Sequence, residues 1–178
     1  MIKPRKNKHI FVFGIFAVDI SFYVDKKVNP GETIIAKGSN IGPGGKASNQ
    51  AISARKLGAS TTLITRLGND NFCSYANTIW KKEKLSTSAK IDKTLPTGMA
   101  GIFIDDKTGE NSVIVDPGAS ARLGLNDFNS QKSKMRKGDI FLTQFEQSSD
   151  TTFSVLKEAK KLGMITIFNP APFGKINK

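Results

Sequence analysis

Short apolar runs alternate with helical patterns along most of the chain. Segments rich in β-branched and aromatic residues predict strands at 9–16, 60–68, 139–145 and 164–172. Between them, apolar positions recur at helical spacing, which predicts helices at about 46–57, 69–85, 126–136 and 150–163. Strands that alternate with helices in this way predict an α/β fold built on a parallel sheet.

Two segments, at about 20–40 and 86–118, break this alternation. The first holds two short β-rich runs around a turn at Pro30 and Gly31. The second contains a predicted hairpin over 99–119, with a polar turn that includes Gly109. We expect the two segments to pair into a second, smaller sheet beside the main one.

The formal charge of +12, from 27 Lys and Arg against 15 Asp and Glu, admits nucleic acid as a partner. However, the basic residues are mostly lysines, which suit bidentate base and phosphate recognition less well than arginines. They are also scattered, and no aromatic residues are interleaved with them as a stacking surface would require. We therefore predict a solvated lysine-rich surface and keep nucleic-acid binding as a weaker alternative.

Residues 1–8 are basic and precede the apolar run at 9–16. A signal peptide is the alternative, but the run continues into Asp19 without a clear cleavage site. We predict a disordered arm over 1–8 and one domain over 9–173. No apolar run approaches the roughly 18 residues that a membrane span needs. The lone Cys73 excludes an internal disulfide and fits a reducing compartment, so a cytoplasmic location is expected.

The stretch "GPGGKASNQ" at 42–50 is the strongest candidate for chemistry. It fails as a P-loop, because Asn40 replaces the leading glycine and Ala47 replaces the hydroxyl residue. It fails as a dinucleotide loop, because Ala47 replaces the third glycine and no predicted strand ends in the loop. A tight turn without a ligand remains open. The alternative is a site for a neutral polyol, with backbone N–H groups at a helix start and with Lys46 and Asn49 beside them.

The segment "GGKASNQAISARKLGASTTLITRLG" at 44–68 resembles the first signature of the ribokinase-like (PfkB) carbohydrate kinases. Further segments resemble other parts of that family, so the resemblance extends from about residue 9 to 173; they are "FGIFAVD", "NPGET", "TGMAGIFIDDKTGENSVIV", "QFEQ" and "FNPAP". The resemblance implies a Rossmann-like three-layer α/β fold with a small β-sheet lid. It also implies transfer of the ATP γ-phosphoryl group to a sugar hydroxyl with Mg²⁺, with K⁺ as a further cation, and a homodimer formed through the lid.

Carried over by position, the resemblance places the sugar between the main sheet and the lid. Asp19 would accept hydrogen bonds from sugar hydroxyls, and Glu146 would complete the polar contacts. Gly45, Lys46 and Asn49 would contact the sugar from the glycine loop and the first helix turn. Asp and Glu are acceptors, whereas Asn both donates and accepts, as a polyol requires.

Two departures from the family limit this prediction. Ala17 stands where an asparagine is usual, which puts ribose in doubt and leaves a related sugar or a nucleoside open. The Gly-Ala-Gly-Asp motif of the family's catalytic and ATP-binding part does not occur here, and members run to about twice this length. We therefore expect a sugar-binding half whose C-terminal part and catalytic Asp are missing, and little turnover. A non-catalytic sugar-binding module is the alternative.

The missing part also has a predicted physical consequence. A parallel sheet is normally covered on both faces, so a sheet that stops after the strand at 164–172 exposes an edge and apolar side chains. We expect the isolated chain to be poorly soluble or to self-associate.

Overall fold

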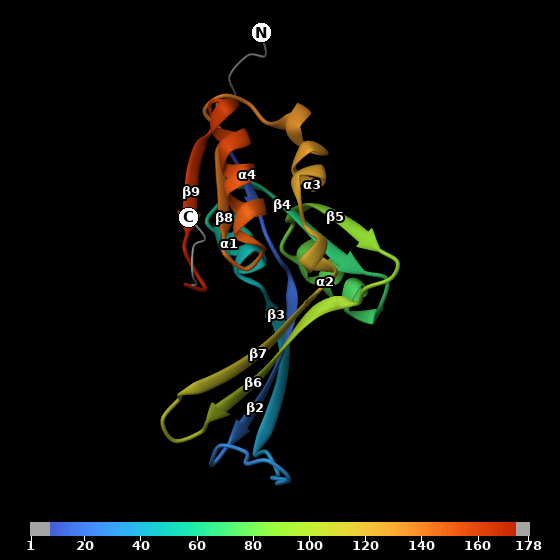
Figure 1. Ribbon diagram of the computed structural model, residues 1–178, viewed down its shortest axis with the longest axis vertical. Helices are drawn as coiled ribbons and strands as arrows, with labels where there is room; N and C mark the ends of the chain where they lie inside the picture. Colours follow the sequence, from blue (N-terminus) through green and yellow to red (C-terminus); the bar gives the residue numbers. More distant parts are fainter. Residues whose placement is uncertain (1–7, 174–178) are drawn as a thin grey trace.

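The computed structural model describes residues 8–173, so the arm predicted over 1–8 lies almost wholly outside the described residues. Figure 1 shows two sheets that follow one another along the long axis of the molecule. Sheet A has five strands in the order β5-β4-β1-β8-β9, and every neighbouring pair is parallel. Its strands are β1 (His9–Phe13), β4 (Ser60–Gly68), β5 (Ser86–Asp92), β8 (Ile140–Gln144) and β9 (Ile165–Asn169).

Helices cover sheet A on both faces, as the apolar strands require. On one face, α1 (Lys46–Lys56) and α2 (Asn71–Lys82) pack over a core that includes Trp80. On the other, α3 (Leu125–Asn129) and α4 (Ser149–Lys161) pack over a core that includes Phe141. Short 3₁₀ turns at Ala119–Arg122 and Lys132–Lys134 flank α3. This arrangement confirms the predicted α/β fold.

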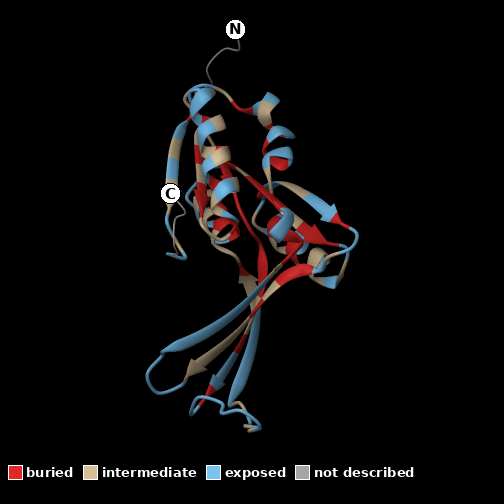
Figure 2. Cartoon of the chain, in the orientation of Figure 1, coloured by how far each residue is buried: buried red, intermediate tan, exposed pale blue. Residues whose placement is uncertain are grey.

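Sheet B is the predicted small sheet, and it projects from the α/β body as a lid (Figure 1). Its four strands lie in the order β3-β2-β6-β7. They are β2 (Ala17–Val24), β3 (Gly38–Gly44), β6 (Thr97–Asp105) and β7 (Asn111–Gly118). The β2–β6 pair is parallel, and the two outer pairs are antiparallel. Figure 2 shows that buried residues concentrate in the body, while much of the far end of the lid is exposed.

The structure differs from the sequence prediction in three places. Strand β5 pairs with β4 in sheet A, so the second lid segment begins at Thr97 rather than near 86. Residues 33–37 form no strand, and α3 ends at Asn129 because the chain turns into a 3₁₀ segment. A single domain over 9–173 stays a prediction.

No helix in residues 8–173 is long and apolar enough to cross a bilayer.

Candidate functional site

The predicted site residues come from three elements that meet where the lid joins the body. Asp19 lies in lid strand β2. Gly45 is the N-cap of α1, and Lys46 is the first residue of that helix. Glu146 follows the carboxyl end of β8, in the chain that leads to α4. The carboxyl ends of parallel strands are where open α/β sheets bind ligands.

Glu146 joins the end of β8 to the start of α1. Its Oε2 accepts a hydrogen bond from the Lys46 backbone N–H at 2.6 Å, and its Oε1 accepts one from Lys46 Nζ at 3.1 Å. A carboxylate at a helix N-terminus is favourable because the helix dipole and the open N–H groups both attract negative charge. It also offsets the cost of placing the Lys46 cation there. The Lys46 N–H is therefore paired, which corrects the expectation that the helix start leaves it open.

Asp19 is half-buried and close enough to the other two charges to respond to them. Burial raises the pKa of the Asp19 carboxyl, the negative charge of Glu146 raises it further, and Lys46 opposes both effects. The carboxylates of Asp19 and Glu146 and the ammonium of Lys46 thus form a triad in which the negative charges outnumber the positive charge. Donor groups from a ligand would relieve this imbalance by hydrogen bonding to the ionised form of Asp19.

The two glycines before α1 are required for different reasons. A Cβ on Gly44 would lie 2.0 Å from Asp19 Oδ1, so a side chain there would displace the carboxylate. Gly45 has a φ of +82°, which side chains disfavour, and its Cβ would lie 2.5 Å from the Ile15 carbonyl oxygen. The glycine pair therefore lets strand β3 pass close to Asp19 and turn at once into α1.

This turn corrects one step of the sequence argument. Strand β3 runs to Gly44 and is followed by α1 after a single residue, so a strand does end in the glycine stretch. The strand belongs to the antiparallel edge of the lid rather than to a βαβ unit, and Ala47 still replaces the third glycine. The dinucleotide-loop interpretation fails on those two grounds.

Asn49 lies one helical turn beyond Lys46, and its side chain is exposed. The structure places Asn49 on the same helix as Lys46, and its role as a sugar contact stays a prediction. Ala17, the departure from the family pattern, is 2% exposed in β2.

An amide network, which the sequence analysis did not single out, is formed by Gln144 and Gln147, on either side of Glu146 in the sequence. The Gln144 side-chain amide donates to Gln50 Oε1 on α1, which ties β8 to that helix. Gln147 donates to Gln144 O at 2.7 Å and to Thr152 Oγ1 at 2.9 Å, which ties the same segment to α4. The signal in the sequence was the run of glutamines directly after a buried apolar strand, where polar side chains need partners.

The arrangement suits recognition of a neutral ligand rich in hydroxyls. Asp19 and Glu146 supply acceptors, Lys46 supplies a donor, and Asn49 supplies both. Among residues 8–173, no group of three or more His, Cys, Asp or Glu side chains could hold a metal ion.

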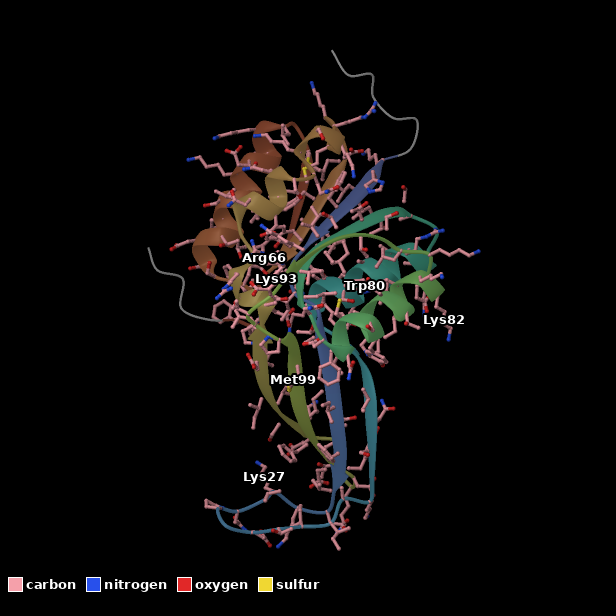
Figure 3. The ribbon with its side chains drawn as sticks, turned by 90° about the vertical axis from the view of Figure 1, so that its right-hand side faces the viewer. Lys27, Arg66, Trp80, Lys82, Lys93 and Met99 are labelled. Atoms are coloured by element: carbon pink, nitrogen blue, oxygen red, sulfur yellow. The ribbon has the colours of Figure 1, made fainter. Side chains whose placement is uncertain are left out.

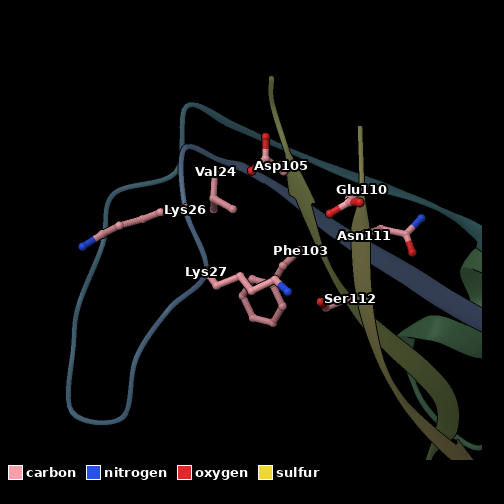
Figure 4. Close-up of a pocket in the computed structure, with 8 residues that line it drawn as sticks. All are labelled: Val24, Lys26, Lys27, Phe103, Asp105, Glu110, Asn111 and Ser112. Carbon is pink, nitrogen blue, oxygen red and sulfur yellow. The ribbon is translucent and has the colours of Figure 1, made fainter. Parts of the chain in front are cut away.

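A separate hollow at the far end of the lid is a weaker candidate. Figure 4 shows Lys26 and Lys27 on one side of it and Asp105 and Glu110 on the other. The Asp105 carboxylate already accepts hydrogen bonds from the Lys107 and Thr108 backbone N–H groups, which hold the hairpin turn. The hydrogen bond from the Thr108 N–H, followed by that from the Lys107 N–H, lowers the pKa of the Asp105 carboxyl. These hydrogen bonds within the hairpin turn account for a carboxylate at this position without a ligand.

Lysines lie at several separate places on the described part of the chain. Figure 3 shows Lys27 at the far end of the lid, Lys82 on α2 and Lys93 after β5, at well-separated places. These three lysines do not form one continuous track for a phosphate backbone, and the solvated lysine surface stays a prediction.

Comparison with known proteins identifies the class that this fold and site define. A model of the pfkB family of carbohydrate kinases matches residues 7–174. The ribokinase of Dictyostelium discoideum is 36% identical over 158 residues, which are 87% of this chain and 49% of that protein. The chain therefore belongs to the pfkB family of carbohydrate kinases.

Solved structures agree with this assignment. The ribokinase of Giardia lamblia superposes with a TM-score of 0.85 at 27% identity, over 94% of this chain and 53% of that one. The ribokinase of Arabidopsis thaliana, complexed with ribose and ATP, superposes with a TM-score of 0.77 at 25% identity, over 93% of this chain and 54% of that one. This chain thus spans about half the length of the relatives that it matches.

Proposed function

We propose that this chain carries the sugar-binding half of a cytoplasmic, ATP-dependent sugar kinase. The reaction is in-line transfer of the ATP γ-phosphoryl group to a hydroxyl of ribose or of a related sugar or nucleoside. The observation that carries the proposal is the triad of Asp19, Lys46 and Glu146, which three separate elements bring together between lid and body. The Arabidopsis relative, complexed with ribose and ATP, supports both substrates.

In this proposal each residue has a separate part. Asp19 accepts hydrogen bonds from sugar hydroxyls, which would stabilise the ionised carboxylate whose pKa burial and the charge of Glu146 raise. Lys46 donates from its ammonium group, and Glu146 holds the helix start in place while offering a free lone pair. Gly45 lets the sugar approach the backbone, and Asn49 closes the site from the next turn. ATP and Mg²⁺ would supply the phosphoryl group and neutralise its charge, from residues outside this set.

Sugar binding tests the proposal directly. Isothermal titration and thermal-shift measurements with pentoses, hexoses and nucleosides should reveal at least one sugar that binds and stabilises the chain. Binding should be lost in Asp19→Asn and retained in Ser112→Ala, a change on exposed β7. Binding should respond little to salt, whereas nucleic-acid binding weakens steeply as salt rises. No stabilisation by any sugar would contradict the proposal.

The alternative is a non-catalytic sugar-binding module that belongs to the same family. A coupled assay with ATP and Mg²⁺ separates the two. Turnover of the bound sugar supports the kinase, while tight sugar binding that never depends on ATP supports the module.

We also propose that the lid forms a homodimer contact. Sheet B is a single layer, and apolar side chains on both of its faces are exposed; these include Ile41 at 56%, Val113 at 50% and Ile114 at 69%. An exposed apolar sheet of this kind marks an interaction surface. A second lid is the partner that the family resemblance suggests.

A further inference from the structure

A polar hollow of about 250 Å³ lies at the amino edge of sheet A, where β4 and β5 begin. The opposite end of β4 lies at the root of the lid, because the Gly68 N–H donates to Thr97 Oγ1 at the start of β6. Strand β4 has nine residues, so it separates the hollow from the carboxyl edge, where the sugar-site residues lie, by about 30 Å. The residues that line the hollow are Arg55, Gly58, Ser60, Thr61, Lys84 and Ser86.

This lining carries two cations and no carboxylate. Arg55 lies in the last turn of α1, and Lys84 follows the end of α2. Arg55 Nε donates to the Lys84 carbonyl oxygen at 3.0 Å, which holds the two residues together and leaves both Nη groups of the guanidinium unpaired. Glu83, the acidic neighbour of Lys84 in the sequence, forms an ion pair with Lys56 instead. Within residues 8–173, no carboxylate pairs with Arg55 or Lys84.

The backbone of Lys84 is a second, independent sign that its side chain is used. Among the described residues, Lys84 is the only non-glycine residue with a left-handed φ, at +52°. Its N–H donates to the Lys81 carbonyl oxygen, so it occupies the position just beyond a helix where glycine is usual. A lysine there costs stability that glycine would not cost. Such an outlier beside a hollow supports a functional role for the side chain.

The two helix ends nearby do not prevent the binding of an anion. Carbonyl groups at a helix C-terminus carry partial negative charge, which would repel an anion if they were open. Here three carbonyl groups of each helix already accept N–H groups from the turn that follows; they are those of Ser53, Ala54, Arg55, Ile79, Trp80 and Lys81. The unpaired Arg55 and Lys84 cations therefore dominate the charge that a ligand in the hollow would meet.

We propose that this hollow binds the phosphate group of a small ligand, at a site separate from the sugar site. A phosphate monoester carries about −1.5 to −2 charges at neutral pH, which matches the two cations. The Arg55 guanidinium offers its two Nη groups as a fork, and Lys84 offers an ammonium on a flexible stem. Ser60 and Ser86 add hydroxyl groups that both donate and accept. The hollow is smaller than the pockets that take drug-sized ligands, so it suits free phosphate or a small phosphate ester.

Calorimetric titration of the native chain, without sugar or ATP and at constant ionic strength, tests the site. The probes are glycerol 3-phosphate, inorganic phosphate and glycerol. Both phosphates should bind saturably to one site, and glycerol should not bind. Tighter binding of glycerol 3-phosphate would identify an ester as the ligand that the hydroxyl groups recognise, whereas equal affinities would identify free phosphate.

Variants locate the bound phosphate. Arg55→Gln should weaken binding by about tenfold or more, because it removes a charged donor. Lys84→Gly should weaken binding to a similar extent and yet raise the melting temperature, because glycine favours the left-handed φ. Lys84→Arg should retain binding. The matched control is Lys82→Ala, since Lys82 is an exposed lysine in the last turn of α2 that does not line the hollow; its affinity should equal that of the native chain.

Three results would overturn the proposal. They are the absence of saturable phosphate binding, full binding in both Arg55→Gln and Lys84→Gly, and an equal loss of affinity in Lys82→Ala, which would indicate general surface charge. The proposal does not rest on the sugar-kinase function. Sugar-dependent stabilisation without phosphate binding would remove the phosphate site and leave the sugar site intact, and phosphate binding without sugar binding would do the reverse.

Discussion

The contact between Gly44 and Asp19 gives the sharpest test of the site. In Gly44→Ala the added Cβ would lie 2.0 Å from Asp19 Oδ1 and 2.3 Å from Asp19 Cγ, well inside van der Waals contact. The carboxylate must therefore rotate away, or β2 and β3 must separate. Overpacking of this kind costs about 1–3 kcal/mol, and at roughly 2–4 °C per kcal/mol for a chain of this size the melting temperature should fall by several degrees.

The effect on ligand binding should be larger than the effect on stability. A hydrogen bond to a charged acceptor contributes about 1.5–3 kcal/mol, so a displaced Asp19 should weaken sugar binding roughly 10- to 150-fold. Gly101→Ala is the control, because Gly101 also lies in the lid and a Cβ there meets nothing within 4 Å. Titration calorimetry and thermal unfolding measure both quantities. Equal sugar affinity in Gly44→Ala and Gly101→Ala would refute the proposed role of Asp19.

Three further predictions concern pH, capping and association. Because the pKa of Asp19 is raised above its ordinary value of 3.8, its ionisation costs stability as the pH rises through that value; Asp19→Asn should therefore resist urea better than the native chain at neutral pH and lose this advantage in acid. The Asp70 side chain caps α2 by accepting from the Cys73 N–H, and it also accepts from the Thr97 N–H at 2.7 Å. Asp70→Ala should therefore lower the free energy of unfolding in urea by about 2–3 kcal/mol, against about 1 kcal/mol for Ser148→Ala, which removes the cap of α4. Equal losses in the two variants would contradict a stabilising role of the Thr97 hydrogen bond. Sedimentation velocity should show concentration-dependent association that Ile114→Lys reduces, and a native monomer independent of concentration would contradict the lid contact.

The layers of the body could be predicted from the sequence because the period of apolar residues differs between strands and helices. Trp80 and Ala76 lie on the buried face of α2, as their spacing indicates, and Asp70 caps that helix. Strand β5 lies in the segment at about 86–118, which was expected in the small sheet because it breaks the strand–helix alternation. A polar edge strand cannot be told from a lid strand by pattern alone. Its partner β4 follows only from the three-dimensional register.

For the site, the sequence and the family resemblance together gave the residue types, but not their connections. The hydrogen bond from the Lys46 N–H to Glu146 joins residues a hundred positions apart, and no local pattern encodes it. The closeness of Gly44 to Asp19 depends on the pairing of β2 with β3, which the sequence suggested only in outline. The Gln50–Gln144 bond was missed for the same reason.

Only Gly45 separates lid strand β3 from helix α1. With a single residue between them, no slack segment can absorb a displacement of the lid before it reaches the helix. A tilt of the lid sheet would therefore be transmitted through Gly45 directly to the N-terminus of α1. The first interaction to be strained there would be the hydrogen bond from the Lys46 N–H to Glu146.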